Sequence, residues 1–121
     1  MKKILFIEDE SALQRAVTQI FSDEGYELRQ ALDGEAGLRM AREEKPDLIL
    51  LDLILPQRSG FEILKDLKLD ERTRKIPIII LTNLAGTRDV GRAIELGATT
   101  YLVKTNYRLE EVIEKIKELL P

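Results

Sequence analysis

The chain alternates between short apolar runs and longer segments with helical spacing. Three runs are almost wholly apolar, at residues 4–7, 48–51 and 78–81. Runs this short and this apolar are typical of strands that are buried on both faces of a parallel sheet. Residues 26–31 alternate between apolar and polar positions and predict a more exposed strand, and residues 99–103 predict a fifth strand.

The segments between these runs repeat apolar residues every three or four positions, which is the spacing of one buried helix face. Gly25 is suited to end the first helix, and Asp33 is suited to cap the second. The first helix has its apolar face at Leu13, Ala16, Val17, Ile20 and Phe21, and four more helices are predicted near residues 34–42, 61–67, 87–96 and 109–120.

Strand and helix thus alternate five times without an internal linker. Such alternation implies a parallel sheet with helices on both faces and right-handed crossovers. Alternation does not set the strand order, but the flavodoxin-like order 2-1-3-4-5 is the common solution for five units. We therefore predict a flavodoxin-like α/β fold, a (βα)5 sandwich with a five-stranded parallel sheet of this order, as one domain over residues 1–121.

The composition limits the chemistry. The chain has no cysteine and no histidine, so it lacks disulfides, thiols and the commonest catalytic base and transition-metal ligand. Any metal should then be a hard cation held by oxygen. The net charge of −3 argues against nucleic acid as a ligand of this domain, and no apolar run is long enough to span a membrane or form a signal peptide. We expect a cytoplasmic protein.

One aspartate, Asp52, interrupts the most apolar stretch of the chain, residues 48–56. A buried carboxylate without partners is costly, because its charged form loses water and gains nothing in return. Asp52 should therefore lie where the strand enters a polar site, or be neutralised by another group. We expect it to be the residue at which the strand surfaces.

Other polar residues occupy the ends of the neighbouring strands. Glu8 and Asp9 follow the first strand, Thr82 ends the fourth and Lys104 follows the fifth. In an open parallel sheet, ligands bind outside these carboxyl ends. Three carboxylates repel one another without a cation, and such a site suits Mg2+, with Mn2+ as an alternative. Lys104 and Thr82 could hold phosphoryl oxygens, and Asp52 could act as a nucleophile that forms an acyl phosphate.

Each of these residues has an ordinary explanation when taken alone. Glu8 and Asp9 could be acidic residues favoured at a helix N-terminus. Thr82 could be a cap or a strand former, and Lys104 a solvated charge. Their joint placement at the ends of strands one, four and five, with Asp52 at the third, favours a functional site.

The chain resembles the receiver domains of two-component response regulators from Lys2 to Leu120. The features that carry the resemblance are Glu8-Asp9, Asp52-Leu53-Ile54-Leu55-Pro56 followed by Gly60, and Thr82, Tyr101 and Lys104. The resemblance implies that Asp52 accepts a phosphoryl group from a histidine kinase or histidine phosphotransfer protein. It also implies that Asp9, Asp52 and the backbone carbonyl of Ile54 bind Mg2+ directly, with Glu8 acting through water.

The same resemblance implies roles for three further side chains. Lys104 would pair with Asp52 and then with the phosphoryl group, and Thr82 would move to hydrogen-bond that group. Tyr101 would turn inward as Thr82 moves, changing the surface of the fourth helix, fifth strand and fifth helix. A downstream protein, an effector domain or a second copy could bind this surface. Without the resemblance, Tyr101 is better interpreted as a half-buried strand aromatic.

Several positions depart from the commonest family pattern. Glu8 replaces the more usual Asp. Asn83 stands where a small residue is usual, and could narrow access to the acceptor or hydrogen-bond the phosphoryl group. Thr105 stands where a proline usually follows the lysine, and without proline a cis bond there costs about 2.5–4 kcal/mol. None of these changes removes a required chemical group, so we predict an active receiver.

Ile54 and Leu84 lie two residues beyond Asp52 and Thr82, at positions that flank the path of the hydrolytic water in this family. Both are apolar and offer no group to orient that water. We therefore predict slow self-dephosphorylation, in a domain that catalyses its own Mg-dependent phosphorylation but is not a conventional enzyme.

Other functions fit the residues less well. A receiver-like interaction module that works without phosphorylation need not retain the acidic residues with Thr82 and Lys104. A phosphatase with an aspartyl nucleophile usually has an acid two residues later, where this chain has Ile54. A flavin-binding protein of flavodoxin type is disfavoured because the first loop is acidic and would repel a phosphate.

Overall fold

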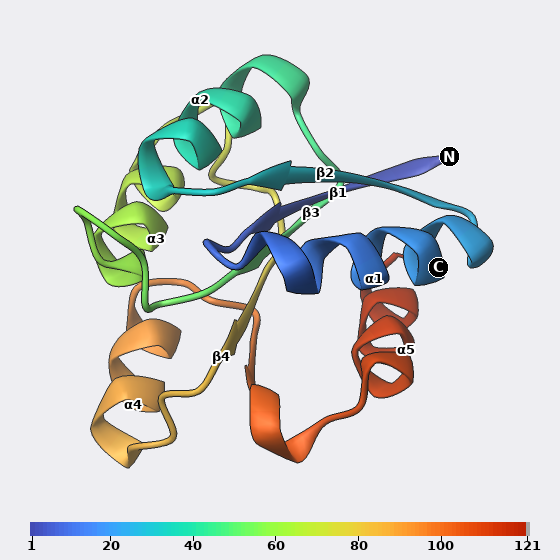
Figure 1. The fold of residues 1–121 in the computed structure, drawn as a ribbon. Helices are drawn as coiled ribbons and strands as arrows, with labels where there is room; N and C mark the ends of the chain where they lie inside the picture. The colour runs from blue at the N-terminus through green and yellow to red at the C-terminus, as the bar shows by residue number, and fades with distance from the viewer. Residues whose placement is uncertain (121) are drawn as a thin grey trace.

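The computed structural model describes residues 1–120, apart from the side chains of residues 11–14 and 16. The predicted apolar positions Leu13 and Ala16 therefore lie outside the described side chains. Five parallel strands form one sheet in the order β2-β1-β3-β4-β5, which confirms the predicted order (Figure 1). The strands are β1 (Lys2–Ile7), β2 (Tyr26–Ala31), β3 (Leu48–Leu51), β4 (Ile78–Thr82) and β5 (Thr100–Val103).

Five α-helices connect and follow the strands. They are α1 (Ser11–Asp23), α2 (Gly34–Glu44), α3 (Gly60–Leu69), α4 (Thr87–Glu95) and α5 (Leu109–Leu119), and one 3-10 turn, η1 (Lys104–Asn106), follows β5. Helices α2, α3 and α4 cover one face of the sheet, while α1 and α5 cover the other (Figure 1). No helix in the described part of the chain is long and apolar enough to span a membrane.

The central strands bury side chains on both faces, as their apolar composition predicts. In β1, Leu5 and Ile7 pack with α2 and α3, while Ile4 and Phe6 pack with α1 and α5. The same alternation continues through β3 and β4, so every residue of β3 is fully buried. Two apolar layers therefore hold the middle of the sheet rigid directly beneath its carboxyl edge.

The predicted helix ends are largely confirmed. Gly25 follows α1 with a left-handed φ of 86°, which an L side chain adopts only with strain. The Asp33 carboxylate accepts the Ala36 N–H at 2.8 Å and caps α2. That helix continues beyond the predicted end to Glu44, where Lys45 adopts a left-handed conformation.

Candidate functional site

The residues predicted to meet at the carboxyl edge of the sheet do so. Glu8 and Asp52 directly follow the neighbouring strands β1 and β3, and their backbones remain in register because the Asp52 N–H donates to the Ile7 carbonyl at 3.1 Å. Thr82 is the last residue of β4, and Lys104 follows β5. Four strands therefore deliver two carboxylates, a hydroxyl and an amine to one place.

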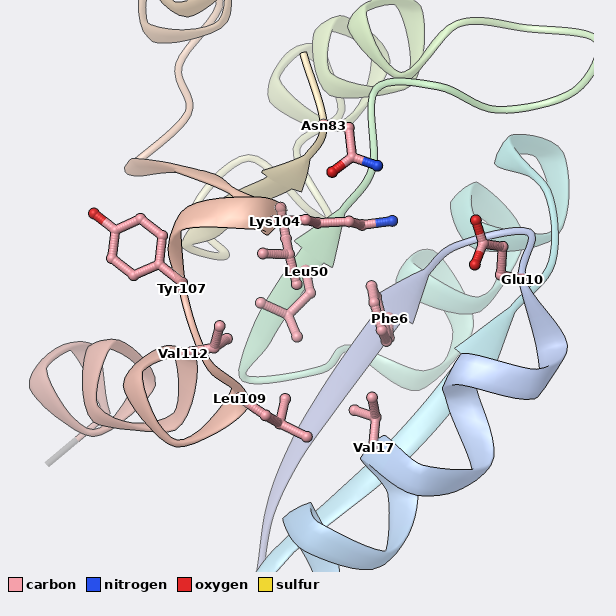
Figure 2. A pocket seen from close by; sticks show the side chains of 10 residues that line it. Phe6, Glu10, Val17, Leu50, Asn83, Lys104, Tyr107, Leu109 and Val112 are labelled. Carbon is pink, nitrogen blue, oxygen red and sulfur yellow. The ribbon is translucent and has the colours of Figure 1, made fainter. Parts of the chain in front are cut away.

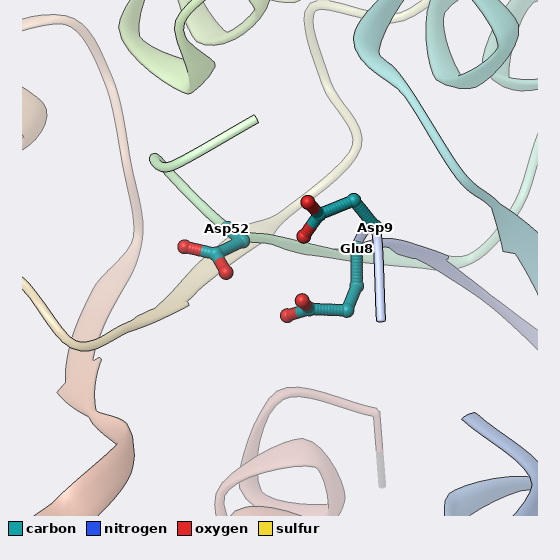
Figure 3. Close-up of side chains that lie close together, drawn as sticks. All are labelled: Glu8, Asp9 and Asp52. Carbon is teal, nitrogen blue, oxygen red and sulfur yellow. The ribbon is translucent and has the colours of Figure 1, made fainter. Parts of the chain in front are cut away.

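Glu8, Asp9 and Asp52 form an acidic cluster at this edge. Figure 3 shows their carboxylates close together, and one oxygen from each lies within 4.8 Å of the others. Asp9 is exposed, whereas Glu8 is fully buried. An exposed carboxylate beside buried ones, all with hard oxygen donors, fits Mg2+ or Mn2+ better than a softer metal.

The Asp52 side chain does not surface, contrary to the sequence prediction. Strand β3 ends at Leu51 as expected, but Asp52 is only 4% exposed. The side chain is neutralised instead, because its Oδ2 accepts a hydrogen bond from Lys104 Nζ at 2.9 Å and its Oδ1 accepts the Ile54 N–H at 3.1 Å. Of the two explanations for a carboxylate in this apolar stretch, neutralisation by another group is therefore the one that holds.

Lys104 bridges the two buried carboxylates. Its Nζ donates to Glu8 Oε2 as well as to Asp52, and its side chain is only 16% exposed. Burial alone would lower the pKa of Lys104, but the hydrogen bonds to Glu8 and Asp52 raise it above the ordinary lysine value. Lys104 therefore remains a cation. Its ammonium group could exchange its hydrogen bond to a carboxylate for one to another anion.

The two buried carboxylates differ in pKa. Burial, together with the hydrogen bond to Asp52, raises the pKa of Glu8 to about 7 against the opposing effect of Lys104. Burial also acts to raise the pKa of Asp52, but hydrogen bonds from Thr82, Lys104 and the Ile54 N–H outweigh it, and the pKa is lowered. At neutral pH, Asp52 is therefore ionised, whereas Glu8, with a pKa of about 7, is only partly ionised.

The predicted switch residues meet through the loop after β4. Thr82 is fully buried, and its Oγ1 accepts the Leu84 N–H at 3.5 Å. Tyr101 is half-buried, and its hydroxyl donates to the Leu84 carbonyl at 2.7 Å. Leu84 therefore connects the residue beside Asp52 to an aromatic on β5.

The predicted tuning residues differ in their exposure. The side chains of Ile54, at 52% exposure, and of Asn83 face solvent, whereas Leu84 is half-buried. Thr105 is exposed within the η1 turn, and the described backbone has no cis peptide bond at this position or elsewhere. The residue after Lys104 is thus accommodated by a tight trans turn.

A cavity of about 280 Å³ beside the site was not predicted. Figure 2 shows Lys104 and Asn83 at one end of it, above apolar side chains from the sheet, α1 and α5. Its lining includes Phe6, Leu50 and Leu81, whose alternation marks them as facing α1 and α5. The sequence predicts which strand side chains face α1 and α5. It does not predict that side chains leave part of the space between these helices unfilled.

Gly60 has a structural role that the sequence did not explain. A Cβ added at this position would lie 2.3 Å from the Asp52 carbonyl oxygen and 2.5 Å from the Leu53 Cα. The Gly60 N–H also donates to the Leu53 carbonyl at 2.9 Å. The start of α3 therefore packs directly on the backbone of the candidate nucleophile.

Mg2+ is expected to stabilise the protein more at about pH 8 than at about pH 5.5. In the metal-free protein, the pKa of Glu8 is about 7, above the 4.5 of an ordinary glutamate. Its protonated form therefore stabilises the fold fully below pH 4.5, and this contribution is lost as pH rises through 7. A cation in the cluster would then compensate the charge that Glu8 gains.

Thermal unfolding with Mg2+ or with a chelator, followed by circular dichroism at both pH values, measures this difference. Glu8→Gln should make the Mg2+ effect nearly independent of pH over this range. An equal Mg2+ effect at both pH values in the unsubstituted protein would contradict the prediction.

Comparisons with known proteins agree on one family. The family model described as "Response regulator receiver domain" matches residues 4–117. The chain is 38% identical over 120 residues to the DNA-binding dual master transcriptional regulator RpaA of Synechocystis, with 99% of this chain and 49% of RpaA covered. It is 35% identical to sporulation initiation phosphotransferase F of Bacillus subtilis, with 99% and 94% covered.

The solved structures point the same way. The chemotaxis protein CheY4 of Vibrio cholerae superposes with a TM-score of 0.90 at 28% identity, and 98% of each chain is covered. The chain spans about half the length of RpaA and of the transcriptional regulatory protein CiaR of Streptococcus pneumoniae, to which it is 42% identical.

Proposed function

Because the chain belongs to the family of response regulator receiver domains, we propose that it is a phosphoryl-accepting signalling switch with Asp52 as the acceptor. The observation that carries this proposal is the state of Asp52, a buried carboxylate with a lowered pKa and an amine at 2.9 Å. In this proposal, residues 1–121 form the phosphoacceptor domain.

The phosphoryl donor in this proposal is a phosphohistidine on a histidine kinase or a histidine phosphotransfer protein. A carboxylate oxygen of Asp52 attacks the phosphorus, so that an O–P bond forms as the N–P bond breaks. The electron pair of that bond remains on the imidazole nitrogen, which takes up a proton from solvent. The products are an acyl phosphate on Asp52 and a neutral histidine.

The rest of the site would stabilise this transfer. Asp9, Asp52 and the Ile54 carbonyl would hold Mg2+ directly, and Glu8 would act through water. The ion, when bound, neutralises charge on the oxygens of the transferring group. Lys104, which donates to Asp52 at 2.9 Å, would move its hydrogen bond to a phosphoryl oxygen, and the Thr82 hydroxyl, which is hydrogen-bonded with Asp52, would donate to another.

The output would be a population shift at the α4–β5–α5 surface. A phosphoryl group that attracts Thr82 would displace the loop after β4, and Tyr101 is hydrogen-bonded to that loop at Leu84. A downstream protein, an effector domain or a second copy of the domain could then recognise the altered surface. Two relatives are named as transcriptional regulators, which supports an effector of some kind.

Intact-protein mass spectrometry after incubation with a small phosphodonor tests the proposal. With acetyl phosphate and Mg2+, one phosphoryl group per chain is expected, and a chelator should prevent its addition. If neither small phosphodonors nor histidine kinases phosphorylate the protein, the alternative, an interaction module that works without phosphorylation, is favoured.

The acyl phosphate is expected to last for minutes or longer, because Ile54 and Leu84 offer no polar group to orient a hydrolytic water. Ile54→Asn should shorten the half-life several-fold by providing an amide at the mouth of the site. The half-life is measured as loss of the phosphorylated mass after the donor is removed.

Ile94→Asn is the matched control, because Ile94 is exposed to a similar degree, 47% against 52% for Ile54, but lies on α4. This control should leave the half-life unchanged. A half-life of seconds in the unsubstituted protein would refute slow self-dephosphorylation.

A further inference from the structure

The loop between β3 and α3 carries the acceptor and the backbone carbonyl proposed as a metal ligand. The start of this loop is fixed by the hydrogen bond from the Ile54 N–H to Asp52 Oδ1, and its end by the bond from the Gly60 N–H to the Leu53 carbonyl. Between them, Gln57 adopts a left-handed φ of 68°. A non-glycine residue holds such a conformation only where surrounding contacts enforce it.

Arg58, the next residue, supplies contacts of this kind. Its guanidinium donates to three carboxylates: Nη1 to Glu35 Oε1 at 2.7 Å, Nε to Glu62 Oε2 at 3.0 Å and Nη2 to Asp66 Oδ2 at 2.7 Å. These bonds raise the pKa of Arg58 well above its ordinary value, with Glu35 as the largest cause. Its backbone N–H donates to the Pro56 carbonyl at 2.7 Å.

The three carboxylates come from two helices. Glu35 lies in the first turn of α2, while Glu62 and Asp66 lie on the same side of α3. The planar guanidinium has donors in fixed directions, so three simultaneous bonds set its position more sharply than a single ion pair would. Arg58 thereby ties the middle of the loop to the helices on either side of it.

The ordinary explanation is that these are surface ion pairs that add slightly to stability. Glu35 and Glu62 have side chains 61% and 55% exposed, and exposed pairs of this kind contribute little to the free energy of unfolding. If Arg58 instead fixes the conformation of the loop, its loss should change the loop clearly while lowering the free energy of unfolding only slightly. If it only adds surface ion pairs, its loss should leave the loop unchanged.

We propose that Arg58 is a positioning residue, which holds the β3–α3 loop, and with it the Ile54 backbone that is hydrogen-bonded to Asp52, in one conformation. The inference deepens the proposed function, because the loop conformation would determine how well Mg2+ binds. In the described part of the chain, the hydrogen bonds of the Arg58 side chain go to Glu35, Glu62 and Asp66 rather than to Glu8, Asp9 or Asp52, so Arg58 would act through the backbone of the loop.

The test compares Arg58→Gln and Arg58→Lys with Arg72→Gln. Arg72 is the matched control: it is an exposed arginine bonded to Asp70 at 2.9 and 3.1 Å, located between α3 and β4 and away from the acceptor loop. Amide hydrogen exchange at Ile54 and Gly60 is measured by NMR in the metal-free proteins. The Mg2+ dissociation constant is measured by titration, and the unfolding temperature by circular dichroism.

Arg58→Gln should accelerate exchange at Ile54 and Gly60 and weaken Mg2+ binding by about ten-fold, as loss of groups that orient metal ligands commonly does. Arg58→Lys should recover part of both effects, because it keeps the charge but not the three-way geometry. Arg72→Gln should leave both unchanged. The unfolding temperatures of Arg58→Gln and Arg72→Gln should fall by similar small amounts.

Unchanged exchange at Ile54 and Gly60 in Arg58→Gln would overturn the inference, as would equal effects in Arg72→Gln. The exchange measurement needs no metal and decides the role of Arg58 by itself. Absence of Mg2+ binding in the unsubstituted protein would instead count against the proposed function, so the two failures are distinguishable.

Discussion

Replacing Asp52 with asparagine is expected to abolish phosphorylation while the protein remains folded. The amide has no anionic oxygen to attack phosphorus. Among the described residues, no carboxylate other than Asp52 is hydrogen-bonded both to Lys104 and to the Ile54 N–H. Folding should survive because Lys104 still pairs with Glu8, and the asparagine oxygen can still accept the Ile54 N–H. Incorporation of phosphoryl groups is measured by mass spectrometry, and folding by circular dichroism.

Asp47→Asn provides the matched control for this substitution. Asp47 precedes β3, and its Oδ2 accepts the Lys3 N–H at 2.7 Å, a bond that an asparagine oxygen can preserve. The control should be phosphorylated as fully as the unsubstituted protein. Phosphorylation of Asp52→Asn at an undiminished rate would show that another residue is the acceptor.

Replacing Gly60 with alanine is expected to lower the free energy of unfolding by about 3 kcal/mol, the upper part of the range typical of overpacking. The added Cβ would lie 2.3 Å from the Asp52 carbonyl oxygen and 2.5 Å from the Leu53 Cα. These are backbone atoms, so the conflict cannot be relieved by a side-chain rotation. Either α3 or the acceptor loop must shift, and phosphorylation should slow as well. Urea denaturation measures the change in stability.

Gly91→Ala serves as the control for glycine replacement. Gly91 lies within α4, and a Cβ added there would meet no atom within 4 Å apart from its chain neighbours and the backbone of its own helix. Alanine favours helix over glycine, so this variant should gain up to about 1 kcal/mol in stability. A Gly60→Ala variant as stable as the unsubstituted protein would contradict the close packing of α3 on the acceptor backbone.

The sequence was sufficient to predict the fold because its signals are local. The apolar runs at residues 4–7, 48–51 and 78–81 are short, and each is followed by a helical segment, so alternation alone indicated a parallel sheet. Parallel strands then place their carboxyl ends together, which brought Asp52 and Lys104 to one site without knowledge of their contacts.

The electrostatic state of the site could not be predicted in the same way. Whether Asp52 is exposed depends on Lys104, which is far away in the sequence and must reach over the end of the sheet to bind it. The order of strands along the chain predicts Lys104 at the carboxyl edge, where it lies, but the pattern around Asp52 predicts a side chain at the surface. The structure buries the pair together with Glu8 and so makes the amine part of the site's interior.

Contacts between side chains on separate elements were also beyond prediction. Nothing in the sequence near Arg58, which lies in a loop, indicates that Glu35 on α2 will be within 2.7 Å of its guanidinium. Gly60 could be matched to a family pattern, but the reason for a glycine is visible only when α3 lies on the backbone of Asp52. Such details depend on packing between elements, which patterns within one element do not encode.

Locating the phosphoryl group within the chain tests most directly whether Asp52 is the acceptor. After phosphorylation, borohydride reduces an aspartyl phosphate to homoserine, and peptide mass spectrometry then identifies the altered residue. Homoserine is expected at position 52 and at no other carboxylate, and only when donor and Mg2+ were both present. Homoserine derived from Asp9, or a phosphoryl group that resists borohydride and maps to a hydroxyl side chain such as Thr82, would contradict it.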